Sequence, residues 1–252
     1  MPRTPVIAGN WKMHKTLAEA ADLANALALS VGTAAGVDVV LCPPFTTLAT
    51  VAAAIKGTNI KLGAQNCHFE DQGAFTGEIS PAMLKDLGVS YCILGHSERR
   101  QFFGETDAGV NRKARALYKH GIIPIICVGE TLEDREAGQT AAVVTAQIRG
   151  SLEGLPADKM ATATVIAYEP VWAIGTGKTA TKEQAQEVHA LIRNLLASMY
   201  TRDLAMQVPI QYGGSVKPAN ARELMEQTDI DGALVGGAAL DAESFTGIVK
   251  FD

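Results

Sequence analysis

The stretch Ile122-Ile123-Pro124-Ile125-Ile126-Cys127-Val128 is almost entirely apolar. It is far shorter than the roughly 20 residues that a membrane-spanning helix needs. An apolar run of this length without alternation is typical of a strand buried on both faces, as in a parallel sheet. Val37-Asp38-Val39-Val40-Leu41 has the same character. Similar short runs recur along the whole chain, and they begin near Val6, Val37, Ile60, Ser90, Ile122, Thr162, Gln207 and Ile230.

The segments between these runs carry signals for helices. Thr16 with Glu19 and Thr181 with Gln184 have the spacing of capping boxes, in which a hydroxyl and a later side chain satisfy free backbone N–H groups. Ser80-Pro81 offers an N-cap followed by proline at the first helical position. Within residues 181–200 one apolar stripe is formed at steps of three and four by Ala185, Val188, Ile192, Leu195 and Met199. Off this stripe lie Lys182, Glu183, Gln186 and Arg193.

Eight alternations of strand and helix in 252 residues match the size of a closed (β/α)8 barrel. A doubly wound open sheet would also hold them, but no Gly-x-Gly-x-x-Gly turn follows the first strand. We therefore predict an α/β fold in which residues 1–252 form a single domain, a parallel eight-stranded barrel with outer helices. In such a barrel, the chemistry lies where the strands end and the loops to the helices begin.

The composition excludes several classes of function. The 22 Lys and Arg residues against 27 Asp and Glu residues give a net charge of −5, so there is no overall basic footprint for nucleic acid. Apolar residues make up 47% of the chain, which excludes a disordered protein. We see neither a membrane segment nor a secretory signal in the sequence. Four cysteines without a Cys-x-x-Cys pair make no disulfide scaffold, so a cytoplasmic location is expected.

Polar and glycine-rich segments follow five of the predicted strands. They are Gly9-Asn10-Trp11-Lys12, Gly95-His96-Ser97-Glu98-Arg99-Arg100, Tyr168-Glu169-Pro170-Val171-Trp172-Ala173-Ile174-Gly175-Thr176-Gly177-Lys178, Tyr212-Gly213-Gly214-Ser215-Val216 and Val235-Gly236-Gly237-Ala238. Taken together, these segments closely resemble the triosephosphate isomerase family, over nearly the whole chain. The resemblance implies a cytoplasmic TIM-barrel isomerase of glycolysis and gluconeogenesis. It would interconvert dihydroxyacetone phosphate and D-glyceraldehyde 3-phosphate through an enediolate, without a cofactor.

That reaction needs a carboxylate base, an electrophile for the developing oxyanion, and exclusion of water. Glu169 is the candidate base, since it precedes a proline and a Gly-containing loop that can close over it. His96 is the candidate electrophile, and a helix starting at Ser97 would keep its ring neutral. A neutral histidine at a helix amino terminus is a feature of the triosephosphate isomerase family, so this state of His96 is implied by the resemblance. Lys12 would offset the negative charge of the enediolate and the phosphate, and Asn10 would supply a neutral donor.

Small residues after the later strands are candidates for binding the substrate phosphate through backbone N–H groups. They are Ser215, Gly236 and Gly237, joined by Gly175 when its loop closes. The lid loop is predicted to comprise Pro170, Val171, Trp172, Ala173, Ile174, Gly175, Thr176, Gly177 and Lys178. The resemblance also implies that Glu130 holds this loop near Trp172 when the loop is open, whereas Cys127 is expected to be structural.

Several other functions do not fit the same residues. The segment 175–179 is similar to the end of a nucleotide-binding P-loop, but Trp172 stands where that motif needs glycine. No two of the five histidines have the spacing of metal ligands, so no metal is expected. A metal-dependent pentose-phosphate epimerase would need histidines at several strand ends, and a Schiff-base aldolase would need a lysine near Glu169. An inactive phosphate-binding barrel would lack the base or the electrophile.

The segment 65–79 is long for a loop of a barrel, and it shows no periodic pattern. It contains Phe69 and Phe75, and an exposed apolar patch of this kind often marks an interface. The loop could instead fold back over its own barrel. The resemblance implies a homodimer in which Phe75 and Thr76 contact the partner, with Thr76 beside the partner's Asn10 and His96.

Overall fold

The strands form a closed barrel in which each strand pairs in parallel with the strand that follows it in the chain. The computed structural model describes residues 3–174 and 179–251. β8 returns to β1, with Gly232 opposite Val6 and Val235 opposite Gly9. The strands are β1 Val6–Asn10, β2 Asp38–Cys42, β3 Lys61–Ala64, β4 Tyr91–Leu94, β5 Ile123–Val128, β6 Val165–Tyr168, β7 Ile210–Tyr212 and β8 Gly232–Val235. The predicted (β/α)8 TIM barrel is confirmed.

The apolar runs lack alternation because both faces of the barrel wall are buried. In β5, Ile125 and Cys127 belong to a cluster inside the barrel, whereas Ile126 and Val128 belong to the larger core between the barrel and the helices. Successive side chains of a strand point to opposite faces, so a strand between two apolar layers must be apolar throughout.

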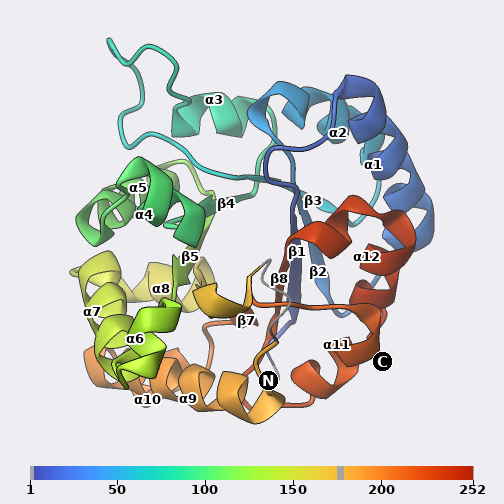
Figure 1. The fold of residues 1–252 in the computed structure, drawn as a ribbon. Helices are drawn as coiled ribbons and strands as arrows, with labels where there is room; N and C mark the ends of the chain where they lie inside the picture. Colours follow the sequence, from blue (N-terminus) through green and yellow to red (C-terminus); the bar gives the residue numbers. More distant parts are fainter. Residues whose placement is uncertain (1–2, 175–178, 252) are drawn as a thin grey trace.

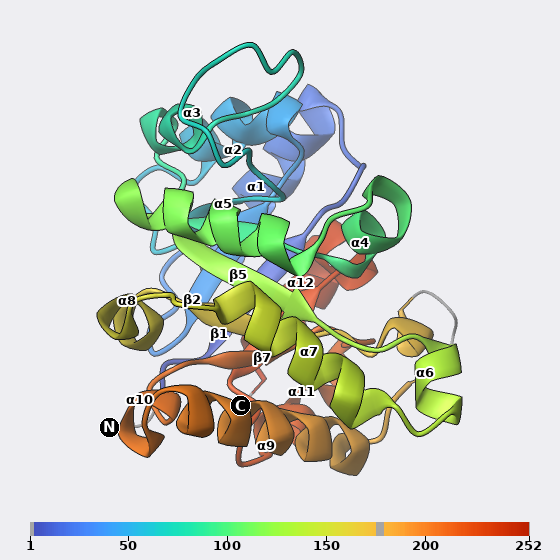
Figure 2. The same cartoon turned by 90° about the vertical axis from the view of Figure 1, so that its left-hand side faces the viewer.

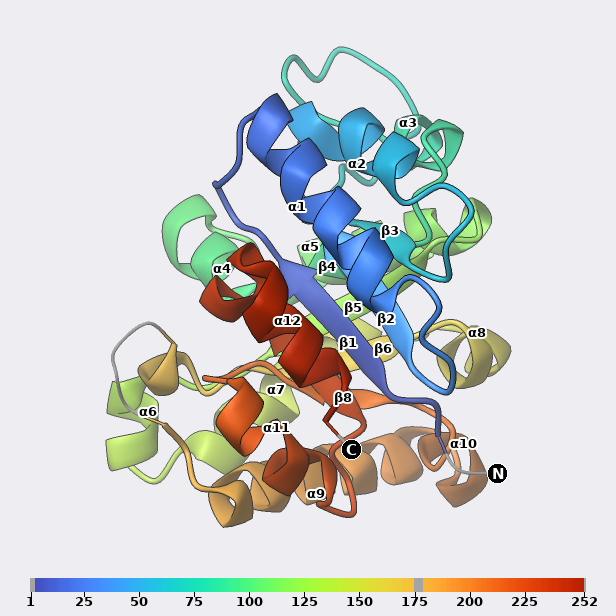
Figure 3. The same ribbon diagram turned by 90° about the vertical axis from the view of Figure 1, so that its right-hand side faces the viewer.

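Helices surround the barrel on all sides (Figure 1). They are α1 Leu17–Val31, α2 Leu48–Ala54, α3 Pro81–Asp86, α4 Ser97–Phe103, α5 Asp107–Lys119, α6 Leu132–Glu136, α7 Thr140–Leu152, α8 Ala157–Thr162, α9 Lys182–Met199, α10 Arg202–Ala205, α11 Pro218–Met225 and α12 Ala242–Val249. Short 3-10 turns occupy Phe45–Thr47, Val171–Ala173 and Gly237–Leu240. Side views show α5 and α7 alongside β5 (Figure 2), and α1 and α12 flanking β1 (Figure 3). Within the described part of the chain, no helix is long and apolar enough to cross a membrane.

The predicted starts of the helices are confirmed. Capping boxes are present at Thr16 and Thr181, and Ser80 Oγ accepts a hydrogen bond from Met83 N–H at 3.2 Å. Each cap satisfies N–H groups that the first turn of a helix leaves without a backbone partner. These local sequence signals therefore set where the helices begin.

Two features differ from the sequence prediction. The run expected to begin near Thr162 starts at Val165, because Thr162 ends α8 and its hydroxyl donates to Asp158 O at 2.7 Å. Arg193, expected off the apolar face of α9, is buried. Its guanidinium is satisfied by Asp229 and Asp231 and by the carbonyls of Ala205 and Val208. A buried charge is tolerated when it is paired and hydrogen-bonded in this way.

Candidate active site

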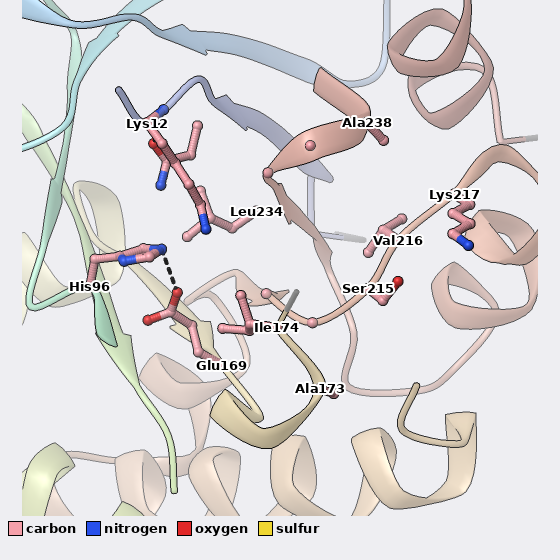
Figure 4. A pocket seen from close by; sticks show the side chains of 15 residues that line it. Lys12, His96, Glu169, Ala173, Ile174, Ser215, Val216, Lys217, Leu234 and Ala238 are labelled. Carbon is pink, nitrogen blue, oxygen red and sulfur yellow. Dashed lines mark hydrogen bonds and ion pairs between the residues drawn. The ribbon is translucent and has the colours of Figure 1, made fainter. Parts of the chain in front are cut away.

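The four predicted catalytic side chains lie around one cavity of about 280 Å³ at the carboxyl ends of the strands (Figure 4). Asn10 ends β1 and Lys12 follows it, His96 follows β4, and Glu169 follows β6. The same cavity is lined by Ser215, Gly236 and Gly237. The fold thus brings together strand ends that are far apart in the sequence, because parallel strands of a barrel all end at the same rim.

Glu169 is buried, and both of its carboxylate oxygens are hydrogen-bonded. Oε1 lies 2.9 Å from Nε2 of His96, and Oε2 accepts the N–H of Ser97 at 2.9 Å. Its own N–H donates to Val128 O at 2.8 Å, which ties it to β5. Burial raises the pKa of Glu169, whereas its interactions with His96, with the Ser97 N–H and with Lys12 together lower it by more. The net shift is downward, so the carboxyl is ionised.

His96 caps the amino terminus of α4 with its own side chain. Its Nδ1 accepts the backbone N–H of Glu98 at 3.2 Å. An N–H group can donate only to an unprotonated nitrogen, so the ring proton is on Nε2, facing Glu169. Burial lowers the pKa of His96, whereas the charge and hydrogen bond of Glu169 and the charge of Glu98 together raise it by more. The Glu98 N–H opposes protonation of Nδ1, and this hydrogen-bond pattern identifies the ring as neutral.

Lys12 adopts a left-handed backbone conformation, with φ of 50°, directly after β1. Such strain in a non-glycine residue costs about 1 kcal/mol or more and often accompanies a functional site. Asn10 Oδ1 accepts the Lys12 N–H at 3.0 Å, and Gln65 Nε2 donates to the Lys12 carbonyl at 2.9 Å. The ammonium pairs with Glu98 Oε1 at 2.5 Å. It would lie 3.8 Å from a Cβ on Gly236, so its charge adjoins the predicted phosphate site.

Of the predicted phosphate-binding residues, Ser215 lies across the cavity from Glu169 and His96 (Figure 4), and Gly236 and Gly237 line the same cavity. Asn220 Nδ2 donates to the Ser215 carbonyl at 3.1 Å and fixes the turn after β7. A Cβ on Gly237 would meet no other atom within 4 Å, so its backbone is open to approach. Gly175 lies outside the described residues.

The first part of the predicted lid loop is held by a buried carboxylate. Glu130 Oε1 accepts from Trp172 Nε1 at 2.9 Å, from Tyr168 Oη at 3.1 Å and from Arg135 at 3.2 Å. The contact between Glu130 and Trp172 expected from the resemblance is therefore present. Ala173 and Ile174 reach the cavity. Thr176, Gly177 and Lys178 lie outside the described residues, as Gly175 does.

Six further residues line the cavity without a predicted role: Gly213, Gly214, Val216 and Ala238 lie within the strand-end segments that resemble the family, whereas Lys217 and Leu234 lie outside them. Gly213 is required by close packing, because a Cβ there would lie 2.9 Å from Glu169 Cγ and 3.1 Å from the Tyr168 carbonyl. Its position directly after β7 was a signal for this role. Leu234 offered no such signal, because its apolar side chain is typical of any barrel strand.

The segment 65–79 extends beyond α3 and away from the barrel (Figures 1 and 2). Thr76 is exposed, and Phe75 retains 43% exposure. Phe75 and Thr76 are therefore not covered by their own barrel, although Phe69 and Asp71 of the loop contact Arg112 and His120. The loop is ordered around His68, whose ring lies 4.2 Å from that of Phe69 and 4.3 Å from that of Phe75.

Among residues 3–174 and 179–251, no three His, Cys, Asp or Glu side chains cluster so that they could hold a metal ion. The four cysteines are buried and unpaired. Burial raises the pKa of the Cys127 thiol, and the neighbouring Glu169 charge raises it further. Such a thiol is inert and structural rather than nucleophilic. Independence from a metal or cofactor stays a prediction.

Comparison with known proteins gives one consistent result. The sequence model of the family described as triosephosphate isomerase matches residues 5–252. A triosephosphate isomerase of Carboxydothermus hydrogenoformans is 60% identical over 248 residues, which cover 98% of each chain. Those of Alkaliphilus oremlandii and Moorella thermoacetica are 57% and 59% identical, and the matched residues cover at least 99% of each chain.

Proposed function

The chain belongs to the triosephosphate isomerase family, and from this premise we propose how its residues divide the chemistry. The enzyme interconverts dihydroxyacetone phosphate and D-glyceraldehyde 3-phosphate, a step of glycolysis. We propose Glu169 as the base, His96 as the electrophile, Lys12 and Asn10 as the groups that stabilise the developing charge, and the backbone around Ser215, Gly175, Gly236 and Gly237 as the phosphate site.

The proton transfer begins at Glu169. In the resting geometry both carboxylate oxygens accept hydrogen bonds, so the carboxylate must turn from His96 and Ser97 towards the substrate. It then removes a proton from the carbon next to the carbonyl and returns it to the former carbonyl carbon, while the hydroxyl proton passes to the former carbonyl oxygen. Closure of the lid loop would exclude water and strengthen the base.

The departure of Glu169 leaves the Nε2–H of His96 without its acceptor. The substrate carbonyl oxygen takes that place, so the same N–H stabilises the enediolate oxygen as charge develops. Lys12 offsets this charge and that of the phosphate, and the amide of Asn10 supplies a further donor. One observation supports this reading above the others: the hydrogen bond between His96 and Glu169 lies beside the Lys12 ammonium at one cavity.

A coupled assay for triose phosphate interconversion in EDTA tests the function and its independence from metals. Glu169→Asp retracts the carboxylate by one methylene, so we expect kcat to fall by about 100-fold or more while the fold is retained. Leu29→Ala, at an exposed position on α1, serves as a control and should keep full turnover. Near-normal turnover of the Glu169 variant would remove the base assignment, and an inactive wild type would contradict the function.

The assembly is proposed to be a homodimer in the cytoplasm, with residues 1–252 of each subunit forming a single domain. A second cavity of about 220 Å³ supports the dimer. It adjoins Asn10 and His96 and is walled by Met13, Phe45 and Phe103, which are all partly or largely exposed. A partner's Thr76 would fit beside Asn10 and His96 there, with its loop covering this apolar surface.

A further inference from the structure

The peptide of Gly95, which directly precedes His96, is held on both sides by charged groups. Its N–H donates to Glu105 Oε2 at 3.2 Å, and its carbonyl accepts from Arg100 Nε at 2.8 Å. Gly95 has φ of +67°, and a Cβ there would lie 2.8 Å from Val110 and 3.0 Å from the Arg100 guanidinium. The backbone conformation that aims His96 therefore depends on glycine and on these two partners.

All three side-chain nitrogens of Arg100 donate hydrogen bonds around Gly95. Besides Gly95 O, its guanidinium donates to Cys127 O at 3.1 Å and to Asp107 Oδ1 at 2.5 Å. The side chain is 17% exposed. Because the guanidinium is planar and presents its donors in a fixed fork, it holds the ends of β4 and β5 at a set separation.

These contacts close a ring that contains the base and the electrophile. Arg100 holds Gly95, and His96 follows Gly95 and bonds Glu169 at 2.9 Å. The N–H of Glu169 donates to Val128 O at 2.8 Å, and the residue before Val128 is Cys127, which Arg100 also holds. We propose that Arg100 is a positioning residue for the reaction, which fixes His96 and Glu169 relative to each other through the backbone of Gly95 and Cys127. This inference rests on the proposed roles of His96 and Glu169.

A substitution that keeps the charge of Arg100 but changes the geometry of its donors distinguishes positioning from a simple effect of charge. Arg100→Lys keeps the positive charge but cannot bond both carbonyls and Asp107 in one plane. If the role is positioning, lysine should fail to restore activity. The predicted phosphate site is built from other strand ends, so the binding of inorganic phosphate should be unchanged.

The experiment compares Arg100→Lys with wild type and with Arg193→Lys. Arg193 also bonds backbone carbonyls and aspartate, but it is more deeply buried than Arg100 and lies at the opposite end of the barrel. We expect kcat of Arg100→Lys to fall by about 10- to 100-fold, the cost of a small misplacement of catalytic groups, with KM changed less than about twofold. Arg193→Lys should lower thermal stability but leave kcat within about twofold of wild type.

A second readout does not depend on turnover. In ligand-free wild type, the ¹⁵N and ¹H resonances of His96 should report a neutral ring with a hydrogen-bonded Nε2–H. Arg100→Lys should shift or broaden them, and Arg193→Lys should not. If wild type has no isomerase activity, the proposed function fails, while these resonances still decide the positioning role.

The inference is overturned if Arg100→Lys keeps kcat within about threefold of wild type and leaves the His96 resonances unchanged. It is also overturned if Arg193→Lys lowers kcat as much.

Should Arg100→Lys not fold, a second variant serves instead. Asp107→Asn removes the charge that orients the Arg100 guanidinium and keeps the size of the Asp107 side chain. That variant should then show a smaller loss of kcat with the same shift of the His96 resonances, and wild-type values for both would refute the role. Sedimentation of each variant checks that the state of assembly is the same.

Discussion

His189 is a buried titratable residue that the reaction does not use. Its ring on α9 is fully buried, and Nδ1 donates to the Asp229 carbonyl at 3.1 Å. In the part of the chain that the structure describes, Nε2 has no hydrogen-bond partner. Burial lowers the pKa of His189 to about 3, with the Asp229 carbonyl acting in the opposite direction. The His189 ring is therefore neutral in the folded protein, and it takes a second proton only after unfolding exposes it to water.

This gives a prediction for stability against pH. An unfolded histidine titrates at about 6.5, so between pH 6.5 and about 3 the unfolded state binds the extra proton. The free energy of unfolding should fall as the pH falls through this window, by up to about 1.4 kcal/mol per pH unit from this residue. His189→Gln removes that part of the slope. Urea unfolding at several pH values and one protein concentration measures it.

The substitution can also change the free energy of unfolding by an amount that does not depend on pH. Because only the slope of this free energy against pH is compared, such a constant change does not affect the result. His14→Gln, at an exposed position, is the matched control and should keep the wild-type slope. Equal slopes for wild type and His189→Gln would show that His189 does not contribute to acid unfolding.

Among the single elements, the loop after β6 extends from a firmly held turn to the cavity that contains the catalytic residues. Its first turn, Val171–Ala173, is fixed by Glu130, which is held in turn by Tyr168 and Arg135. Ala173 and Ile174 then extend to the cavity that contains Glu169. A loop anchored at one end and reaching the reacting groups is suited to act as a lid.

Deleting residues 173–176 should therefore expose the enediolate to water. An unprotected enediol phosphate loses its phosphate, so we expect more methylglyoxal per turnover and weaker binding of phosphate analogues. A variant with the same four positions changed to glycine and serine keeps the length and should give an intermediate effect. The measurement is the ratio of methylglyoxal to isomerised product. The same ratio in the truncated and intact enzymes would contradict the lid role.

In the molecule as a whole, the segment 65–79 extends beyond α3 and away from the barrel (Figures 1 and 2). It is braced by the stack of His68 with two phenylalanines and by the Arg112 guanidinium, 4.0 Å from the ring of Phe69. His120 Nε2 lies 2.6 Å from Asp71. A loop held this firmly while exposing Phe75 is suited to enter a partner.

Thr76→Arg should disrupt that contact by adding a bulky charge to the loop. We expect sedimentation to shift from dimer towards monomer, and activity to fall in step, because the partner loop would support Asn10 and His96. Ser198→Arg adds the same charge at an exposed position of α9 and should leave both unchanged. A monomeric wild type at micromolar concentration would refute the dimer, and a fully active monomeric variant would refute only its link to catalysis.

The order of strands and helices, the barrel and the strand-end residues could all be predicted from the sequence. These follow from local signals: apolar runs, capping residues such as Thr16, and polar segments directly after each run. A barrel collects all its strand ends at one rim, so the locations of Asn10, Lys12, His96 and Glu169 followed from the prediction of the fold.

Which side chains contact one another could not be predicted from the sequence and depends on the folded barrel. Arg193 and His189 look like surface residues of a helix, yet partners some 35 to 40 positions away bury them. The ring of contacts from Arg100 through Gly95, His96 and Glu169 joins three strand ends. Periodicity and capping report only neighbours in the chain, whereas these contacts depend on distances of a few ångströms between distant segments. Those distances are fixed only when the barrel closes and its side chains pack.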